Sequence, residues 1–298
     1  MGAKQSKFPK FNYLLKKKKE SSNETITTNS LSQEPEPISK FPSASEHIDY
    51  LHQHHFLVKS IWSSNFSSPI EDSLKNGARV LDVRCGAGTF LLELSNEYTL
   101  SEFTGIDKTK LFPALIKPSN LNFINADILE GLPFQENHFD FVYLNIIEPR
   151  YTSNQWTFVI DELIRVAKPG AYIECQGFDS FAGTVGPKFL KFIQKFAMIF
   201  ATNGVGMGSR YHIKSLLSSK SSNYNSDQIK IMVGKNGGKL GVLLEEHTTM
   251  FFVNVIGKAI ADLNNITMDE LKRDWKEVLK EFSETKTSLE IFRIWIMK

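Results

Sequence analysis

A glycine-rich turn that follows a short apolar run is the first feature with the chemistry of a ligand site. The run 80–83 leads into Gly86 and Gly88, and helix-forming residues follow from Thr89. Glycine has no side chain, so the backbone of such a turn can approach a ligand closely. The first turn of a helix adds unpaired N–H groups. A tight strand-to-helix turn without any ligand has the same pattern, so the turn alone does not decide.

Two acidic residues follow the next strand-like runs. Asp107 ends the run 102–107, and Asp127 comes directly after the run 121–126. In a parallel sheet the carboxyl ends of the strands share one edge, where ligands bind. We expect Asp107 to accept hydrogen bonds from both hydroxyls of a ribose, and Asp127 to accept one from an adenine amino group beside Ile128. Either residue could instead be a solvated strand end, but their joint occurrence favours a nucleoside site.

The order of predicted elements indicates an α/β fold. Apolar runs predict five strands, and amphipathic spacing predicts helices that alternate with them, which is typical of a parallel sheet covered by helices. The strands are expected at 78–83, 102–107, 121–126, 139–144 and 171–176, and the helices at 89–98 and 155–168, the latter ending at Pro169 and Gly170. Further on we expect helices at 187–203, 239–262 and 267–283, and strands at 229–234 and 288–297.

The ordered motifs VLDVRCGAGTF, GID, NADILEGLPF, HFDFVYLN and ELIRVAKPGAYIE resemble those of class I S-adenosylmethionine-dependent methyltransferases over residues 80–178. The segment 47–70, HIDYLHQHHFLVKSIWSSNFSSPI, resembles the leading helix of fungal LaeA-like methyltransferases. The resemblance implies a Rossmann-like, seven-stranded methyltransferase sheet with helices on both faces. It also implies a reversed final hairpin from 229–234 and 288–297, and S-adenosylmethionine as the cofactor.

The motifs also imply a set of cofactor-binding residues, and the chain departs from the family pattern at some of them. The set is Asp82, Arg84, Cys85, Gly86, Gly88, Asp107, Ala126, Asp127, Ile128, Leu144 and Asn145. Arg84 stands where the family has its first glycine, beside the methionine end of the cofactor, so its side chain either swings out to solvent or fills the site. Asp49-Tyr50 replaces the usual Asp-Arg, and Leu144-Asn145 replaces Gln-Arg.

The expected function is methyl transfer from S-adenosylmethionine to a small molecule or a protein. Because the cofactor is already activated, the protein mainly aligns the acceptor and excludes water, and no catalytic residue is predicted. Arg84 supports an alternative, a degenerate methyltransferase fold that serves as a binding or scaffold protein, with membrane tethering as an option. An NAD-dependent oxidoreductase is disfavoured, because the glycine spacing lacks the full G-x-G-x-x-G and a Lys-Pro-Gly turn precedes the fifth strand.

We expect a disordered basic and polar tail over 1–45 and a methyltransferase domain over 46–298, with Ser45 as the first helix cap. The domain divides into a leading helical segment 46–76, a cofactor-binding core 77–178, a lid 179–228, and C-terminal helices with the strand hairpin over 229–298. The acceptor is expected to enter between the leading helix and the lid.

Histidines and cysteines carry weaker signals. His47, His52, His54 and His55 could suggest a metal, but no cysteine or acid accompanies them, so we expect surface or lid histidines and no metal. Cys175 lies in an apolar run and is expected in the core. Two cysteines without zinc-type spacing fit a reducing compartment. The cytoplasm is therefore the expected location.

Charge is concentrated near residue 1. Residues 1–20 hold seven lysines and one acid, whereas the whole chain carries only +2, so no specific nucleic-acid partner is expected. The opening Met1-Gly2 with Ser6 fits the N-myristoylation pattern, and the lysines 16–19 could add attraction to an anionic membrane. A nuclear address and a plain disordered tail remain the alternatives.

Replacing the acylation site tests the membrane expectation. Gly2→Ala should release the protein from membranes, because one basic cluster without the acyl chain binds only weakly. Neutralising lysines 16–19, or raising the salt concentration, should release it partly. Cell fractionation and intact-mass measurement give the readout. A soluble wild-type protein whose mass shows no acyl chain would refute the anchor.

Overall fold

The computed structural model describes residues 43–147, 151–202 and 210–298. The expected tail and Gly2 lie outside them, apart from residues 43–45. The first helix, α1 (Ala44–Trp62), is capped by Ser43, whose side chain accepts a hydrogen bond from the Glu46 N–H at 3.2 Å. The predicted cap at Ser45 is therefore wrong by two residues, because Ser43 has the extended backbone that a cap requires.

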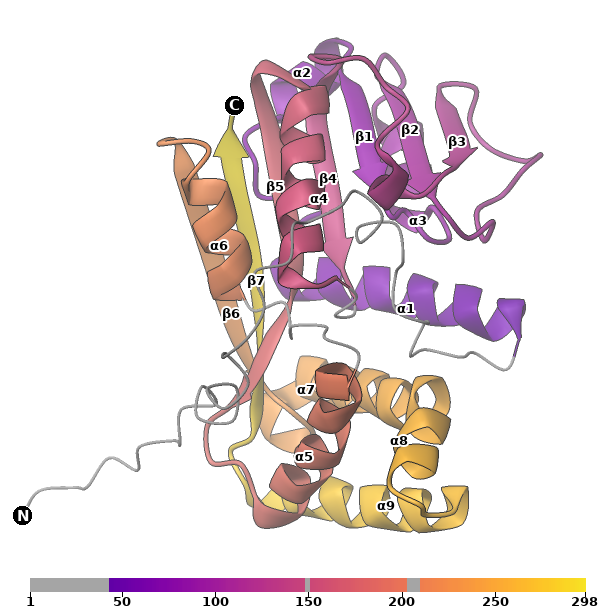
Figure 1. Ribbon diagram of the computed structural model, residues 1–298, viewed down its shortest axis with the longest axis vertical. Coiled ribbons are helices and arrows are strands. Elements are labelled where there is room, and N and C mark those ends of the chain that lie inside the picture. Colours follow the sequence, from indigo (N-terminus) through magenta and orange to yellow (C-terminus); the bar gives the residue numbers. More distant parts are fainter. Residues whose placement is uncertain (1–42, 148–150, 203–209) are drawn as a thin grey trace, which may run out of the picture. The chain divides into compact units, whose positions relative to one another are not determined.

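A seven-stranded sheet forms the centre of the fold (Figure 1). The strands are β1 (Arg79–Val83), β2 (Glu102–Asp107), β3 (Leu121–Asn125), β4 (Phe139–Ile146), β5 (Ala167–Ala182), β6 (Tyr224–Met232) and β7 (Ser288–Met297), in the order β3-β2-β1-β4-β5-β7-β6. The first five are parallel, and β7 runs antiparallel to both β5 and β6. The seven strands and the reversed last pair are as the family resemblance implies.

Helices cover both faces of this sheet, as predicted. Apolar side chains of α4 and α6 pack on one face and those of α2 and α3 on the other. The helices are α2 (Glu71–Asn76), α3 (Thr89–Glu97), η4 (Ile128–Glu130), α4 (Ser153–Val166), α5 (Pro187–Thr202), α6 (Arg210–Ser218), η5 (Lys235–Gly237), α7 (Gly238–Thr249), the π-helix η6 (Met250–Val255), α8 (Gly257–Leu263) and α9 (Met268–Glu284). Within the described residues, no helix is long and apolar enough to cross a membrane.

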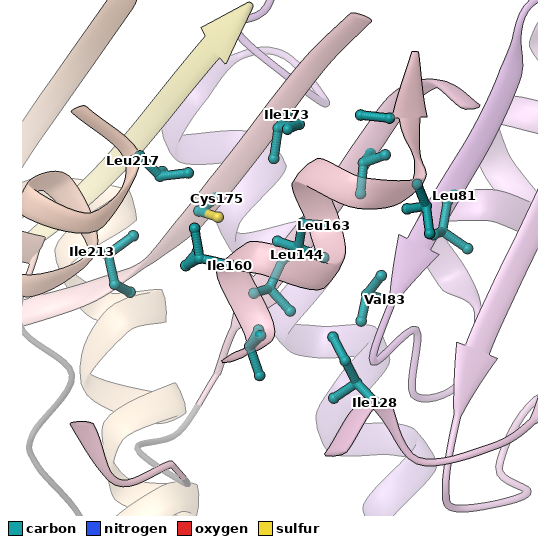
Figure 2. Packing of buried hydrophobic residues seen from close by; sticks show 14 of the residues in the cluster. Leu81, Val83, Ile128, Leu144, Ile160, Leu163, Ile173, Cys175, Ile213 and Leu217 are labelled. Atoms are coloured by element: carbon teal, nitrogen blue, oxygen red, sulfur yellow. The ribbon is translucent and has the colours of Figure 1, made fainter. Parts of the chain in front are cut away.

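The core on the α4 face holds the parallel strands in place. Figure 2 shows Leu81, Leu144 and Ile173 of three neighbouring strands packed with Ile160 and Leu163 of α4. Cys175 is buried here as predicted. Leu144, which the motifs place at the cofactor, is also fully buried in this core. It does not line either of the two cavities described below, and its expected role in binding stays a prediction.

The C-terminal half packs around a second core. Apolar side chains of α1, α5, α7, η6, α8 and α9 bury the ends of β6 and β7. Figure 1 shows these helices below the carboxyl edge of the parallel strands. Phe189 and Phe192 of α5 lie within ring contact of Trp275 in α9. The helical half therefore forms a packed wall beside the edge where the parallel strands end.

Two predicted helices have different boundaries in the structure. The helix expected over 155–168 ends at Val166, and the Lys-Pro-Gly residues 168–170 belong to β5, where Ala167 already pairs with Phe139. The expected lid 179–228 includes the end of β5 and the start of β6. The helix expected over 239–262 is divided, because a π-helix separates α7 from α8.

Candidate functional site

The glycine-rich turn between β1 and α3 is held by backbone hydrogen bonds. The Cys85 N–H donates to the carbonyl of Ile106 at 3.1 Å, and the Gly88 N–H donates to the carbonyl of Cys85 at 2.8 Å. Arg84, Gly86 and Gly88 all have positive φ, at 62°, 55° and 75°. This conformation favours glycine, so Arg84 occupies a position that glycine would adopt with less strain.

The absence of a side chain has a different structural effect at Gly86 than at Gly88. A Cβ on Gly88 would lie 2.4 Å from the ring of Phe123, so the absence of a side chain lets β3 pack against the turn. Gly88 does not line either cavity described below, and its expected contact with a ligand stays a prediction. A Cβ on Gly86 would lie 2.9 Å from Leu51 of α1, and Gly86 does line a cavity.

An outer cavity opens to solvent beside this turn, with about 780 Å³ of space that includes its open mouth. It lies at the carboxyl ends of β1, β2 and β4, where doubly wound sheets bind their ligands. Seven of the predicted site residues line it: Arg84, Gly86, Asp107, Ala126, Asp127, Ile128 and Asn145. The sequence therefore placed these residues correctly at one site, while their role in binding a cofactor stays a prediction.

A second cavity, called the inner cavity, has about 380 Å³ of space that again includes open solvent, and it adjoins the outer one. Four residues line both, namely Leu51, Arg84, Asn145 and Ile147. The predicted residues Asp82 and Cys85 line only the inner cavity. Burial raises the pKa of the Cys85 thiol well above its usual value. Cys85 is therefore a neutral wall residue rather than a nucleophile.

Asp107 already accepts hydrogen bonds from the protein on both carboxylate oxygens. Oδ2 accepts from the Gly86 N–H at 2.9 Å. Oδ1 accepts from the Thr109 N–H at 2.8 Å and the Thr109 hydroxyl at 2.7 Å. A carboxylate has about four acceptor sites, so a ligand hydroxyl can reach Oδ2 directly. A second ligand hydroxyl would have to replace the Thr109 hydroxyl on Oδ1.

The two carboxylate oxygens of Asp127 have different surroundings. Oδ1 caps the short helix η4 by accepting from the Leu129 N–H at 3.0 Å. Oδ2 lies 3.9 Å from the ammonium group of Lys108. The neighbouring Ile128 is buried and presents an apolar surface to the outer cavity. This pairing of an acceptor with an apolar surface suits one edge and one face of an aromatic base.

Asp82 is a buried acid with an unused oxygen. It is 3% exposed, and its Oδ1 has no hydrogen-bond partner among the described residues. Burial, together with the nearby charge of Asp107, raises the pKa of the Asp82 carboxyl well above its usual value. An unsatisfied buried acceptor is costly. A ligand that donated a hydrogen bond to Oδ1 would remove that cost.

Arg84 stays inside the site. Its guanidinium carbon lies 5.4 Å from the centre of the Tyr151 ring, within the range of a cation–π contact. Arg84 lines both cavities, so its side chain lies where they join. Of the two outcomes expected for this residue, escape to solvent or occupation of the site, the structure shows the second.

Helix α1 supplies a buried histidine that the sequence did not place. His54 is 1% exposed, and its Nδ1 lies 3.2 Å from Nε2 of His247 in α7. Tyr50 stacks on His247 with ring centres 4.9 Å apart. The expectation of a surface or lid histidine is wrong for His54. The helical stripe of Tyr50, His54, Leu57 and Ile61, all buried, is the signal that could have found it.

The neighbouring histidines attach α1 to the glycine-rich turn and its helix. His52 Nδ1 lies 2.7 Å from the Thr89 hydroxyl, and His55 Nε2 lies 2.8 Å from a carboxylate oxygen of Glu93. Within the described ranges, no three histidine, cysteine or acidic side chains are grouped as a metal site would require. These contacts make α1 a fixed wall of both cavities.

Comparisons with known proteins agree with this geometry. Residues 80–170 match a family model described as a methyltransferase domain. The N-methyltransferase verN of Clonostachys rogersoniana is 27% identical over 198 residues, which cover 63% of this chain and 67% of that protein. The demethylmenaquinone methyltransferase of Staphylococcus aureus is 28% identical over 132 residues, 43% of this chain and 52% of that enzyme. This second match thus spans about half of the relative's length.

Among solved structures, a cyclopropane-fatty-acyl-phospholipid synthase-like protein from Lactobacillus casei superimposes with a TM-score of 0.50. The match covers 91% of this chain and 98% of that chain at 14% sequence identity. At this level of identity, the similarity concerns the fold.

The buried histidine pair should make the stability of the fold depend on pH. Burial lowers the pKa of His247 to about 4, and burial together with the His247 imidazole lowers the pKa of His54 well below 6.5. Below pH about 6.5 the unfolded chain binds protons that the folded chain does not. The free energy of unfolding should therefore fall with decreasing pH from about 6.5 towards 4, by up to about 1.4 kcal/mol per pH unit for each histidine.

Urea denaturation at several pH values between 7.5 and 4.5 measures this effect. In the double variant His54→Leu/His247→Phe, apolar groups replace both partners, so neither is left unpaired. Its free energy of unfolding should fall less steeply with decreasing pH than that of wild type, because about two fewer protons are taken up on unfolding. An equal pH dependence of wild type and double variant would show that the pair titrates normally.

Proposed function

We propose that this chain, which belongs to the class I S-adenosylmethionine-dependent methyltransferases, transfers the cofactor's methyl group to an acceptor held beside the outer cavity. The observation that carries the proposal is the cavity at the carboxyl edge of the sheet, where Gly86, Asp107 and Asp127 come together. The matching methyltransferase domain over residues 80–170 supports it. The test is direct binding of S-adenosylmethionine and S-adenosylhomocysteine.

The residues at the site fit this cofactor. Asp107 would accept from the ribose through Oδ2, which has one protein donor. Asp127 and Ile128 would hold the adenine edge and face. The unused Oδ1 of buried Asp82 lies beside the inner cavity and would suit the amino group of the methionine end. Gly86 leaves room between the glycine-rich turn and α1, because a Cβ at this position would lie against Leu51.

S-adenosylmethionine supplies a methyl group on a sulfonium sulfur, which is already activated for displacement. The protein's part is to hold both reactants in line and to keep water away. Fixed contacts of α1 with α3 and α7 make the wall rigid. No described residue is assigned as a base, since one is needed only for an acceptor that must lose its proton in the step.

The apolar part of the outer cavity indicates the character of the acceptor. Aromatic and aliphatic side chains there are Tyr50, Ile147, Tyr151, Phe251 and Val255. A lining of this kind suits a small, largely apolar molecule better than a charged peptide. One of the two relatives is named as an N-methyltransferase and the other as a demethylmenaquinone methyltransferase. We therefore favour a small-molecule acceptor over a protein.

The cellular setting remains a proposal drawn from the sequence. The seven lysines among residues 4–19 favour an anionic membrane surface as a partner. With the Gly2 pattern, they support a cytoplasmic protein that associates with membranes. The nucleus is the alternative location.

Removing the ribose acceptor tests the cofactor assignment. Asp107→Ala should weaken S-adenosylhomocysteine binding by about 1.5–3 kcal/mol, since it removes a charged hydrogen-bond acceptor. Calorimetry gives the affinity. Asp262→Ala, which changes an exposed acid of α8, serves as the control and should bind like wild type. Unchanged affinity in Asp107→Ala would rule out the ribose contact, and absence of binding to wild type would contradict the proposed function.

Arg84 decides between an enzyme and a degenerate fold. Arg84→Gly should tighten cofactor binding, because it empties the junction of the two cavities and restores the residue that a positive φ favours. Arg84→Ala is the matched control, since it empties the same space but keeps a Cβ on the strained backbone. If crowding dominates, both variants bind more tightly by calorimetry.

The other outcomes have clear meanings. Tighter binding only in Arg84→Gly would assign the effect to the backbone of the turn. Weaker binding in both variants would show that Arg84 holds the cofactor's carboxylate, and the crowding argument would then be wrong. Unchanged binding in both would place Arg84 outside the binding path.

A further inference from the structure

The loop between β2 and β3 presents an apolar tip to solvent. Leu115 and Ile116 are 92% and 91% exposed, the two highest values among the large hydrophobic residues of the described chain. Ala114 beside them is also exposed. Figure 1 shows this connection reaching out beyond β3, the edge strand of the sheet. Single exposed apolar residues are ordinary on protein surfaces, but an adjacent pair exposed to this degree is not.

The loop is anchored on both sides of its tip. Before the tip, the Phe112 ring stacks on Phe123 of β3 with centres 4.9 Å apart. After it, the Lys117 ammonium group donates to the carbonyl of Leu121. At the end of the loop, the Asn120 amide donates to the carbonyls of Ser95 and Ser101 at 3.1 and 2.9 Å. These contacts fix the loop on both sides of its tip. The exposure of the tip therefore belongs to a held conformation of the loop.

The charge of the loop is of one sign. Residues 108–120, KTKLFPALIKPSN, contain three lysines and no acid. Lys110 is exposed, and Lys108 is partly exposed at the base of the loop. Basic residues around an inserting apolar tip are attracted to anionic headgroups near the surface. The seven lysines among residues 4–19 would act in the same direction.

We propose that Leu115 and Ile116 insert into an anionic lipid surface, with the exposed Lys110 of the same loop at the headgroups. A second copy of the chain fits this tip less well. A stable protein interface takes about 20–30 residues on each side. In a two-fold pairing of the tips, the lysines of one loop would also face those of the other. A lipid surface needs neither a large complementary face nor an opposing acid.

The base of the loop connects the proposed membrane contact to the outer cavity. Lys108, Thr109 and Leu111, at its base, line the outer cavity. Docking through the tip therefore brings the cavity mouth near the membrane, where apolar acceptors concentrate. The docking itself does not depend on the proposed methyl transfer. Failure of one leaves the other standing, because vesicle binding and cofactor binding are separate measurements.

Vesicle co-sedimentation of the full chain tests the proposal. The protein is produced without acylation, so that Gly2 carries no lipid, and is mixed with phosphatidylcholine vesicles containing about 30% phosphatidylserine. Leu115→Ser/Ile116→Ser should lower the partition coefficient about tenfold, because two apolar side chains no longer enter the lipid. The matched control is Leu190→Ser/Met198→Ser, which changes two half-exposed residues of α5, away from the β3 edge. The control should partition like wild type.

Leu115→Trp gives a direct readout of insertion. With vesicles, its fluorescence should shift to shorter wavelength and be quenched by brominated acyl chains, beyond the response of the wild-type tryptophans. Equal partitioning of wild type and the tip variant, or a tip tryptophan that lipid does not quench, would overturn the proposal. So would a tip variant that changes only the concentration-dependent self-association of the chain, since the occupant would then be a second copy.

Discussion

The site depends on one hydrogen bond, from the Gly86 N–H to the carboxylate of Asp107 at 2.9 Å. It joins the turn after β1 to the end of β2, and it is possible because Val83 and Ile106 are register partners at the ends of the two strands. The same carboxylate is the group expected to receive a ribose. A ligand at Asp107 therefore bonds to the group that also fixes the turn, so binding and the shape of the turn are coupled. Such coupling favours a preformed site.

Two long strands connect this site to the rest of the chain. β5 pairs with β4 as far as Gly177, and beyond that point residues 178–182 pair only with β7. The helical half packs on this extension and carries Phe251 and Val255 to the outer cavity. A π-helix supplies both residues, and π-helical turns are often found at functional sites. The expected cofactor side thus comes from the first half of the sheet, and the proposed acceptor side also receives residues from far along the chain.

The sequence predicted what depends on local pattern. Buried strands of a parallel sheet are continuous apolar runs, so β1 to β4 and the acids at their ends could be located, and Asp107 and Asp127 do meet at one cavity. Long-range contacts left no such trace. The partner of His54 is 193 residues away, so the α1 stripe could indicate the burial of His54 but not its pairing with His247. The packing of Phe123 against Gly88 likewise depends on a strand that lies far along the chain. Lys-Pro-Gly is typical of a helix stop, but β5 begins at Ala167 and runs through these residues.

Arg84 shows how the constraints of the turn act on its least suited residue. The hydrogen bonds of Cys85 and Gly86 to β2 fix the backbone, and Arg84 must adopt a φ of 62° whatever its side chain. The stem then starts inside the site, and the guanidinium settles over Tyr151. Buried Asp82 cannot offset this charge fully, because its raised pKa favours the neutral acid. Asp107 and Asp127 also line the outer cavity. Their negative charge is then expected to attract a cationic cofactor, which the positive charge of Arg84 repels. We therefore expect cofactor affinity in this chain to reflect a balance between these two carboxylates and Arg84, which a glycine at position 84 would shift towards the carboxylates.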